Sequence, residues 1–299
     1  MGVHLGFRAG LHCGIAVAFG LFVASPALAK HSEKAKGSKH AEASDHSEHA
    51  GSADETGSQE LAKKLSNPIS DLVSVPFQFN WENGVGPDNG LKTVLNIQPV
   101  VPFEISHKWN LIERWIMPYV SQPEYLQNAS GLSDITFSSF FSPNTGKSLI
   151  WGVGPVLTLP MSSDAAVGSG QWSAGPTFVV LKLQGDWIYG LLWNQQWSYA
   201  TVSDRARVAV NQGFFQPFIA WTRPSGVTVT LQSESIANWN AAENSTWTVP
   251  INLLVSKVTT LGPFPFSVQG GAGVYVASPD SGPDWKLRAA FTLILPRRR

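Results

Sequence analysis

The chain has 299 residues and a formal net charge of zero at pH 7, which removes the electrostatic argument for a nucleic-acid partner. Charged residues make up only 14% of it, against about 25% in an average globular protein. Glycine, proline and tryptophan are frequent instead, with 27, 20 and 12 residues. After the first 29 residues no apolar window is long enough for a transmembrane helix.

Residues 1–29 have the pattern of an export signal peptide. Arg8 precedes an apolar run from Gly14 to Val23, which is too short to span a membrane. Ala27-Leu28-Ala29 matches a small-residue cleavage site, so the mature chain is expected to begin at Lys30. A membrane anchor is the alternative. The single cysteine, Cys13, would leave with the signal, and no disulfide is expected in the mature protein.

Residues 30–60 form a charged, histidine-containing linker with no residue more apolar than alanine. Such a segment cannot bury enough surface to offset its chain entropy, so we expect disorder. Its irregularly spaced histidines lie among carboxylates, a set that can bind transition metals. A solvated linker is the favoured interpretation, and no metal site or cofactor is predicted. The histidines concerned are His31, His40, His46 and His49.

Residues 61–73 predict a short amphipathic helical segment interrupted by Pro68. The segment either lies in the periplasm or folds into the mouth of the domain that follows, as a plug.

Residues 74–299 alternate between apolar and polar side chains in many short runs. The clearest run, Trp285 to Leu295, has the period of a β-strand and about the length of a strand that crosses a bilayer. Together with the export signal, this predicts an all-β, closed antiparallel transmembrane β-barrel in the outer membrane of a Gram-negative bacterium. About twelve strands are expected, over residues 74–83, 91–105, 109–121, 131–142, 149–160, 171–183, 186–199, 208–222, 226–235, 246–257, 264–277 and 285–295.

The predicted connections alternate between short and long. Ser106 to Lys108 and Gln184-Gly185 are examples of the short ones, and Met161 to Gly170 and Ser235 to Ser245 of the long ones. Short turns on one rim and long loops on the other are typical of outer-membrane barrels.

Prolines inside the predicted strands are the main objection to a regular barrel, because each removes a hydrogen-bond donor. A soluble β-sandwich is the alternative architecture. The expected third strand also breaks its alternation at Ile112 to Trp115, where a bulge is expected. The prolines are Pro99, Pro102, Pro118, Pro155, Pro176, Pro217 and Pro250.

Tryptophans concentrate near the predicted strand ends. Amphipathic rings favour the headgroup layer of a bilayer, so an aromatic girdle in contact with outer-membrane lipid is expected, with a stacking platform for a ligand as the alternative. The girdle candidates are Trp81, Trp109, Trp151, Trp172, Trp187, Trp247 and Trp285.

Catalytic groups are sparse. His107 is the one histidine after residue 60, and it lies in a predicted turn. A serine nucleophile needs a base, so a barrel lipase would depend on His107. We therefore predict that the chain is not an enzyme.

Polar residues expected to face the barrel interior are mostly amides. A strongly selective ion pore would need a ring of like charges, so the sequence favours a channel for small solutes. Glu234 could instead pair with Lys286 or Arg288 as a structural contact. The candidates for contact with a solute are Gln98, Asn194, Gln196, Gln216, Glu234, Asn252 and Arg288.

Several runs resemble a known family of bacterial outer-membrane proteins. They are Leu61 to Ser70, Ser74 to Gln78, Leu95 to Pro99, Gly131 to Ile135, Phe140 to Pro143, Trp151 to Pro155, Gly168 to Pro176, Trp247 to Asn252 and Ser278 to Trp285. The chain resembles, over residues 61 to 296, the transporters grouped under the MetA pathway of phenol degradation, some of which carry the name neuromedin U. The resemblance implies an outer-membrane barrel that passes small, including aromatic, molecules. It lends no catalytic residue.

Two features depart from that family. The histidine-containing linker has no counterpart in it. Outer-membrane strands commonly end in an aromatic residue that the barrel assembly machinery uses, whereas this chain ends in Leu295 followed by proline and three arginines. Either Phe291 serves instead, or the last residues extend into the periplasm. A structural or ligand-binding barrel with a plugged interior and no transport is the alternative function.

Overall fold

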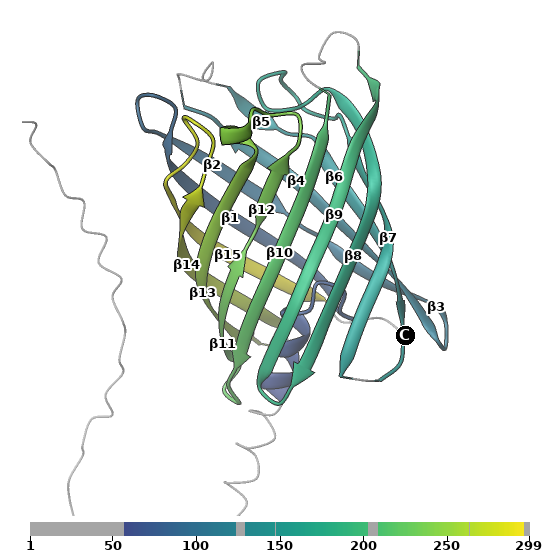
Figure 1. Cartoon of the computed structure of the whole chain (residues 1–299). Helices are drawn as coiled ribbons and strands as arrows, with labels where there is room; N and C mark the ends of the chain where they lie inside the picture. The colour runs from purple at the N-terminus through teal and green to yellow at the C-terminus, as the bar shows by residue number, and fades with distance from the viewer. Residues whose placement is uncertain (1–56, 124–128, 147, 203–208, 263, 296–299) are drawn as a thin grey trace, which may run out of the picture. The chain divides into compact units, whose positions relative to one another are not determined.

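The structure is a computed structural model that describes residues 57–123, 129–146, 148–202, 209–262 and 264–295. The predicted signal peptide and most of the predicted linker lie outside these residues. The described chain forms a closed antiparallel barrel of twelve strands (Figure 1), as the alternating pattern predicts. Closure is direct, because the last strand pairs with the first from Val73 opposite Leu295 to Asn83 opposite Trp285.

Three of the twelve strands are interrupted, so the barrel consists of fifteen segments. These are β1 (Val73–Val85), β2 (Gly90–Ile97), β3 (Val100–Ser106), β4 (Trp109–Ser121), β5 (Ser130–Leu132), β6 (Ile135–Pro143), β7 (Leu149–Leu159), β8 (Gln171–Gln184), β9 (Trp187–Thr201), β10 (Asn211–Thr222), β11 (Val227–Ser233), β12 (Ser235–Asn238), β13 (Trp247–Leu261), β14 (Phe264–Ala277) and β15 (Trp285–Leu295). The pairs β2 and β3, β5 and β6, and β11 and β12 each continue one strand.

Each interruption lies at or opposite a proline, which has no backbone N–H to give to the ladder. Pro99 itself separates β2 from β3. Between β5 and β6, the backbone N–H of Ser133 donates to the carbonyl of Pro118 at 2.8 Å. The registers of β11 and β12 with β13 place Glu234, between these two strands, opposite Pro250. Prolines therefore break the ladder locally without preventing closure.

The bulge expected in the third strand is absent. β4 pairs with β6 in one unbroken register from Trp109 opposite Pro143 to Ile116 opposite Thr136. The run Ile112 to Trp115 departs from the usual pattern because an apolar side chain faces the interior and a charged one faces outward. Ile112 points into an apolar core inside the barrel, whereas Glu113 accepts a hydrogen bond from Ser139 at 3.1 Å on the outer face.

The rims differ as predicted. The connections at one end of the barrel are two to five residues long, for example 107–108 and 144–148. We name this end the short-turn rim. The other end, the long-loop rim, carries connections of up to eleven residues at 160–170. Outer-membrane barrels place their short turns in the periplasm.

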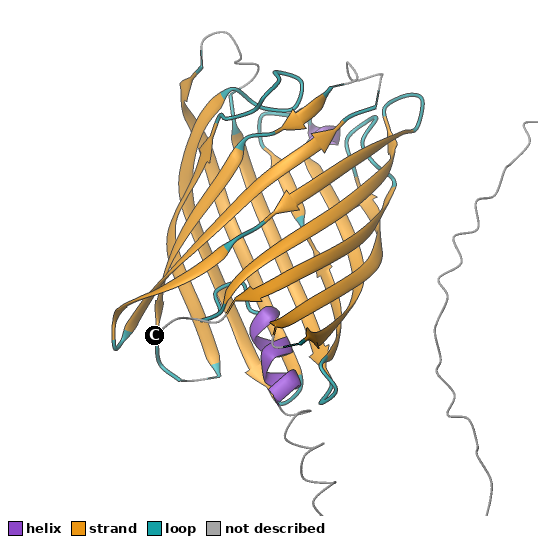
Figure 2. Cartoon of the chain, turned by 180° about the vertical axis from the view of Figure 1, so that it is seen from behind, coloured by secondary structure: helices purple, strands orange, loops and turns teal. Residues whose placement is uncertain are grey.

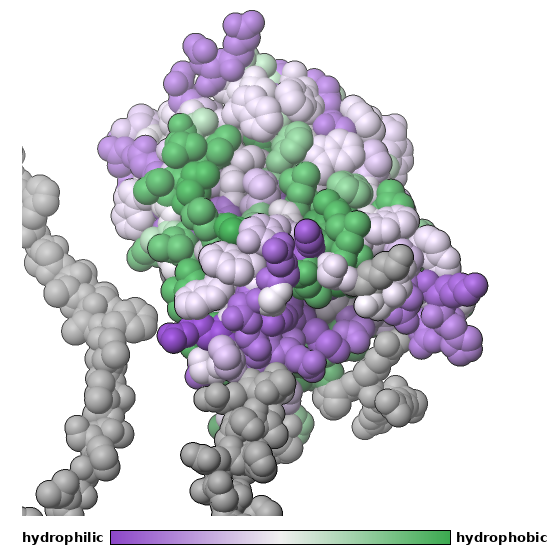
Figure 3. Space-filling model, turned by 60° about the horizontal axis from the view of Figure 1, so that its bottom comes forward, coloured by the Kyte–Doolittle hydropathy of each residue, from purple (hydrophilic) through white to green (hydrophobic). Residues whose placement is uncertain are grey.

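The outer wall is apolar. Large side chains at alternate positions are exposed there, among them Val274, Leu287 and Leu293. Figure 3 shows such apolar residues on the wall and hydrophilic residues gathered toward the short-turn rim. Within the described residues no helix is both long enough and apolar enough to cross a bilayer.

A short helix at residues 57–65 lies at the short-turn rim, followed by a turn at Asn67-Pro68 (Figure 2). The helix begins before residue 61, so residues 57–60, expected to be part of the linker, are helical. Gln59 Nε2 donates to Asp186 Oδ1 at 2.8 Å and to the Thr222 carbonyl at 3.0 Å. Lys63 lies 3.5 Å from the same carboxylate of Asp186. These contacts tie the helix to the turn between β8 and β9.

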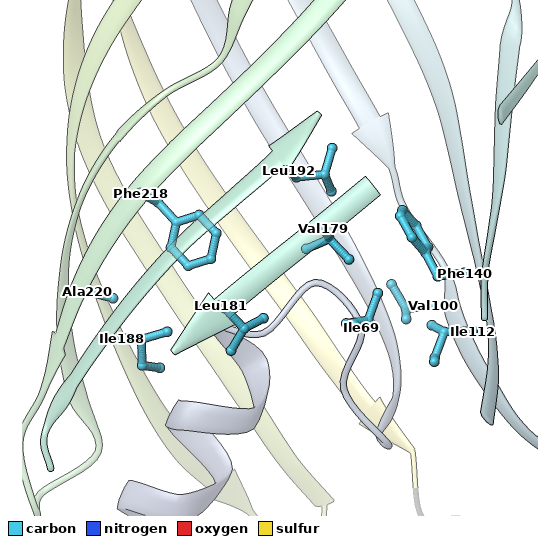
Figure 4. Packing of buried hydrophobic residues seen from close by; sticks show 10 residues of the cluster. All are labelled: Ile69, Val100, Ile112, Phe140, Val179, Leu181, Ile188, Leu192, Phe218 and Ala220. Carbon is cyan, nitrogen blue, oxygen red and sulfur yellow. The ribbon is translucent and has the colours of Figure 1, made fainter. Parts of the chain in front are cut away.

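The segment after the helix enters the barrel. Ile69 is only 4% exposed and packs with inward-facing residues of β3, β4 and β6 to β10, which form one apolar cluster (Figure 4). The cluster contains Ile69, Val100, Ile112, Phe140, Val179, Leu181, Ile188, Leu192, Phe218 and Ala220.

Candidate solute site inside the barrel

A cavity of about 210 Å³ lies inside the barrel, between the N-terminal segment and the wall. The segment contributes Ala62, Leu65 and Pro68 to its lining. The wall contributes inward positions of β1, β3, β4, β10, β11 and β13 to β15. The cavity is therefore a remnant of the lumen that the N-terminal segment leaves unfilled.

One side of the cavity is polar. Gln78, Gln98, Gln216, Gln232 and Gln269 supply amides to the lining, and of these Gln98 and Gln216 were predicted to contact a solute. Gln216 Nε2 donates to Gln232 Oε1 at 3.3 Å, and Gln232 Nε2 donates to Glu234 Oε1 at 3.2 Å. This chain of amides leads to a cluster of charged side chains.

Glu234 is the centre of that charged cluster. Arg288 donates two hydrogen bonds to its carboxylate, at 2.9 and 2.5 Å, and Lys286 Nζ donates a third at 3.3 Å. Arg288 Nε also donates to Asn80 Oδ1 at 2.7 Å. The pairing of Glu234 with Lys286 or Arg288, an alternative to solute contact, is thus present with both partners.

Arg114 is a second cation on the cavity wall, and sequence reasoning missed it. Its Nη2 donates to Gln98 Oε1 at 2.9 Å. Among the described residues no carboxylate forms an ion pair with Arg114. It was missed because it lies between Glu113 and Trp115, where the alternation of polarity is lost.

The apolar side of the interior was also missed. Phe218, Ala220, Val100 and Leu254 line the cavity, and the cluster around Ile69 adjoins it. A sequence signal exists, because runs such as Ile188 to Trp193 are apolar on both faces of the strand. Such runs indicate that something packs against the inner face as well as the outer one.

The predicted solute contacts separate into groups. Gln98, Gln216, Glu234 and Arg288 line the cavity. Asn252 is 1% exposed, and its Nδ2 donates to the Gln232 carbonyl at 3.4 Å. Gln196 accepts a hydrogen bond from Thr158 at 2.6 Å, and Asn194 lies one inward position along from it on β9. Asn194 and Gln196 do not line the cavity, and their contact with a solute stays a prediction.

The predicted girdle tryptophans fall at two levels of the outer wall. Trp109, Trp151 and Trp187 lie near the short-turn rim, where Trp109 and Trp151 stack edge to face at 6.1 Å. Trp81, Trp172, Trp247 and Trp285 lie toward the long-loop rim, and Trp247 contacts Trp239 at 5.6 Å. That these levels mark the two faces of the bilayer stays a prediction.

A long loop folds onto the mouth at the long-loop rim. The Asp134 carboxylate accepts hydrogen bonds from Ser169, from its backbone N–H at 2.6 Å and from its hydroxyl at 2.7 Å. Gln122 donates to the Ala166 carbonyl of the same loop. Together with Lys92 and Val120, these residues line a shallow hollow at the mouth.

His107 lies at the short-turn rim. Its side chain is fully exposed in the turn between β3 and β4, and Nδ1 lies 3.4 Å from Glu104 Oε1. Among the described residues no group of three or more His, Cys, Asp and Glu side chains could hold a metal ion. The linker histidines lie outside these residues.

Comparison with known proteins identifies the fold. No protein-family model and no curated protein matches the chain. The crystal structure of an outer membrane channel from Pseudomonas putida F1 is similar, with a TM-score of 0.54 and 15% identity over 75% of this chain and 94% of that one. The outer membrane phospholipase A of Escherichia coli gives a TM-score of 0.44 and 10% identity over 81% of this chain and 98% of that one. At these identities the likeness shows the fold alone.

These findings define the class of protein. The closed barrel with an apolar outer wall, a fold shared with an outer membrane channel, belongs in the outer membrane of a Gram-negative bacterium. The narrower resemblance to the MetA-pathway family is not confirmed by the comparisons and stays a prediction.

One prediction is corrected. We predicted from the missing histidine partners that the chain is not an enzyme. The barrel fold is shared with an enzyme, outer membrane phospholipase A, so the fold does not exclude enzymatic activity. A likeness at 10% identity shows a shared fold and assigns no reaction.

Proposed function

We propose that this protein is an outer-membrane channel for small solutes, and that residues 57–70 narrow its periplasmic end. The observation that carries the proposal is the cavity of about 210 Å³ inside the closed barrel. It is smaller than a pocket for a drug-sized ligand, which needs about 300 Å³ or more. Small molecules are therefore the expected cargo, and the family resemblance makes small aromatic compounds the first candidates.

The N-terminal segment is the proposed gate. Ile69 anchors it in the apolar cluster, while Gln59 and Lys63 hold its helix to Asp186 at the rim. These anchors are few and lie at one end of the barrel, so the segment can leave the barrel without unpairing any strand.

Channel conductance and vesicle swelling test the proposal. The mature protein should give small conductance steps in planar bilayers, and a variant that lacks residues 30–70 should give larger ones. If both proteins are folded barrels and neither gives conductance or vesicle swelling, the proposal is contradicted.

The alternative is a ligand-binding or structural barrel whose interior stays closed. The burial of Ile69 at 4% exposure favours it, because a permanent plug needs such an anchor. It predicts that the mature protein is silent and that the truncated variant alone conducts.

A further inference from the structure

The cavity carries an uncompensated positive charge. Two arginines and one carboxylate line it, Arg114, Arg288 and Glu234, which gives 2 − 1 = +1. Lys286 contacts the same carboxylate from outside the lining and is not counted. Charges withdrawn from water are costly unless they are paired. An anion that enters the cavity would therefore be stabilised.

Arg114 is the cation that such an anion would meet. Glu234 already holds Arg288 and Lys286 through three hydrogen bonds. Among the described residues, one of the five N–H donors of Arg114 has a hydrogen-bond partner, the neutral amide of Gln98. Its chain neighbour Glu113 cannot neutralise it, because that carboxylate lies on the outer face with Ser139.

The apolar side of the cavity defines the rest of the ligand. Phe218, Val100 and Leu254 line it, with Leu65 and Pro68 of the N-terminal segment. A ligand that is charged throughout would have no apolar group to pack against this surface. A wholly apolar ligand would leave Arg114 without a counter-charge. A carboxylate joined to a compact apolar body satisfies both sides.

We infer that the cavity is a binding site for a small organic monocarboxylate, with the carboxylate on Arg114 and the apolar body against Phe218 and the N-terminal segment. Planar carboxylates match the fork of an arginine guanidinium in two hydrogen bonds. The inference deepens the proposed function by naming the class of solute. Binding of the carboxylate does not depend on the proposed function, whereas its transport through the barrel does.

Equilibrium binding to the refolded mature protein tests the inference without requiring transport. The probe is benzoate, titrated by calorimetry, with benzyl alcohol as the neutral analogue of similar shape and acetate as the anion without an apolar body. We expect benzoate to bind at least about tenfold more tightly than either, because it alone combines a carboxylate for Arg114 with an apolar ring for the other side of the cavity.

Two arginine variants test whether Arg114 binds the carboxylate. Arg114→Gln should weaken benzoate binding about 10- to 100-fold and leave benzyl alcohol binding unchanged. Arg223→Gln, at an exposed arginine in the turn between β10 and β11, is the matched control and should bind like the unmodified protein. Equal binding of benzoate and benzyl alcohol would overturn the inference. So would an Arg114→Gln protein that is folded and binds benzoate normally.

The two proposals fail differently. Benzoate binding without conductance or swelling would refute the channel and keep the binding site. Conductance with no preference for benzoate, and no effect of Arg114→Gln on its binding, would keep the channel and refute the carboxylate site.

Discussion

Arg288 holds Glu234 by two hydrogen bonds across the barrel interior, although the two residues are 54 positions apart in the chain. Glu234 lies where β11 and β12 are interrupted, and Arg288 lies on the strand that closes the barrel against β1. Arg288 also binds Asn80 on β1. The contact therefore links an irregular part of the wall to both strands of the closing seam.

Replacing Glu234 should destabilise the barrel. Glu234→Gln leaves Arg288 and Lys286 without a counter-charge in a partly dry interior, and removing one partner of a buried pair costs about 3–5 kcal/mol. We expect a loss of about 2–4 kcal/mol in the free energy of unfolding, measured by urea titration in lipid vesicles, because lumen water will solvate part of the freed charge. Glu104→Gln is the control, since its exposed pair with His107 should contribute little. A variant no less stable than this control would contradict the argument.

Truncating Ile69 should release the N-terminal segment. Ile69→Ala removes most of a buried side chain, which costs about 2–5 kcal/mol in a rigid core. Because the segment is held at few points, we expect it to detach while the barrel stays folded. Limited proteolysis should cut residues 57–70 faster, and conductance should rise. Lys64→Ala, whose partner Asp71 is exposed, is the control. Unchanged protease sensitivity would show that other contacts hold the segment.

A reversible crosslink tests whether the segment moves during passage. A Cβ built on Gly226 lies 3.2 Å from the Cβ of Ser58, close to the 3.5–4.5 Å of disulfide-linked cysteines. The double variant Ser58→Cys, Gly226→Cys should conduct less when oxidised and recover on reduction. The backbone of Gly226 is left-handed, with φ of +75°, so the variant will lose about 1 kcal/mol of stability. Ser58→Cys alone should not respond to reductant, and equal conductance in both redox states would argue for a fixed plug.

The strands were predictable because burial on one face imposes a period of two. Trp285 to Leu295 was placed correctly by alternation alone. The short and long connections alternate as expected except at 86–89, where four residues replace an expected long loop. Interruptions of this kind were foreseeable, since a proline such as Pro250 has no backbone N–H to donate to the ladder. The positions of the interruptions depend on which residue pairs opposite each proline. These positions were not predictable, because the sequence of one strand does not show its register with the neighbouring strand.

The site was predictable only in part. Gln98, Gln216, Glu234 and Arg288 line the cavity, and each is a polar side chain at a position that the alternation assigns to the interior. The apolar cluster escaped prediction because a rule of polar inside and apolar outside fails where a segment packs in the lumen. Arg114 escaped because the alternation of polarity is lost between Glu113 and Trp115. Ile69 supplies that packing, and it makes Ile112 and Phe140 core residues instead of lumen-facing exceptions.

Glu113 offers a test of where the bilayer lies. Its carboxylate is on the outer face of β4, on the same side as the exposed Trp109 and the exposed Phe141. It is four residues along the strand from Trp109, which is about 10 Å along the membrane normal for a strand tilted by about 40°. If Trp109 marks the periplasmic interface, Glu113 lies within the apolar layer.

Replacing Glu113 should then stabilise the protein. A charged residue on the lipid face costs up to a few kcal/mol near the midplane, and acidic residues cost less than basic ones. Glu113→Leu should therefore raise the free energy of unfolding in vesicles by about 1 kcal/mol. Ser139→Ala, which removes the hydrogen-bond donor to Glu113, should lower the stability of the unmodified protein and leave the Glu113→Leu variant nearly unchanged. A loss of stability in Glu113→Leu would mean that the carboxylate lies at the headgroups, and that the bilayer begins further along the barrel than Trp109.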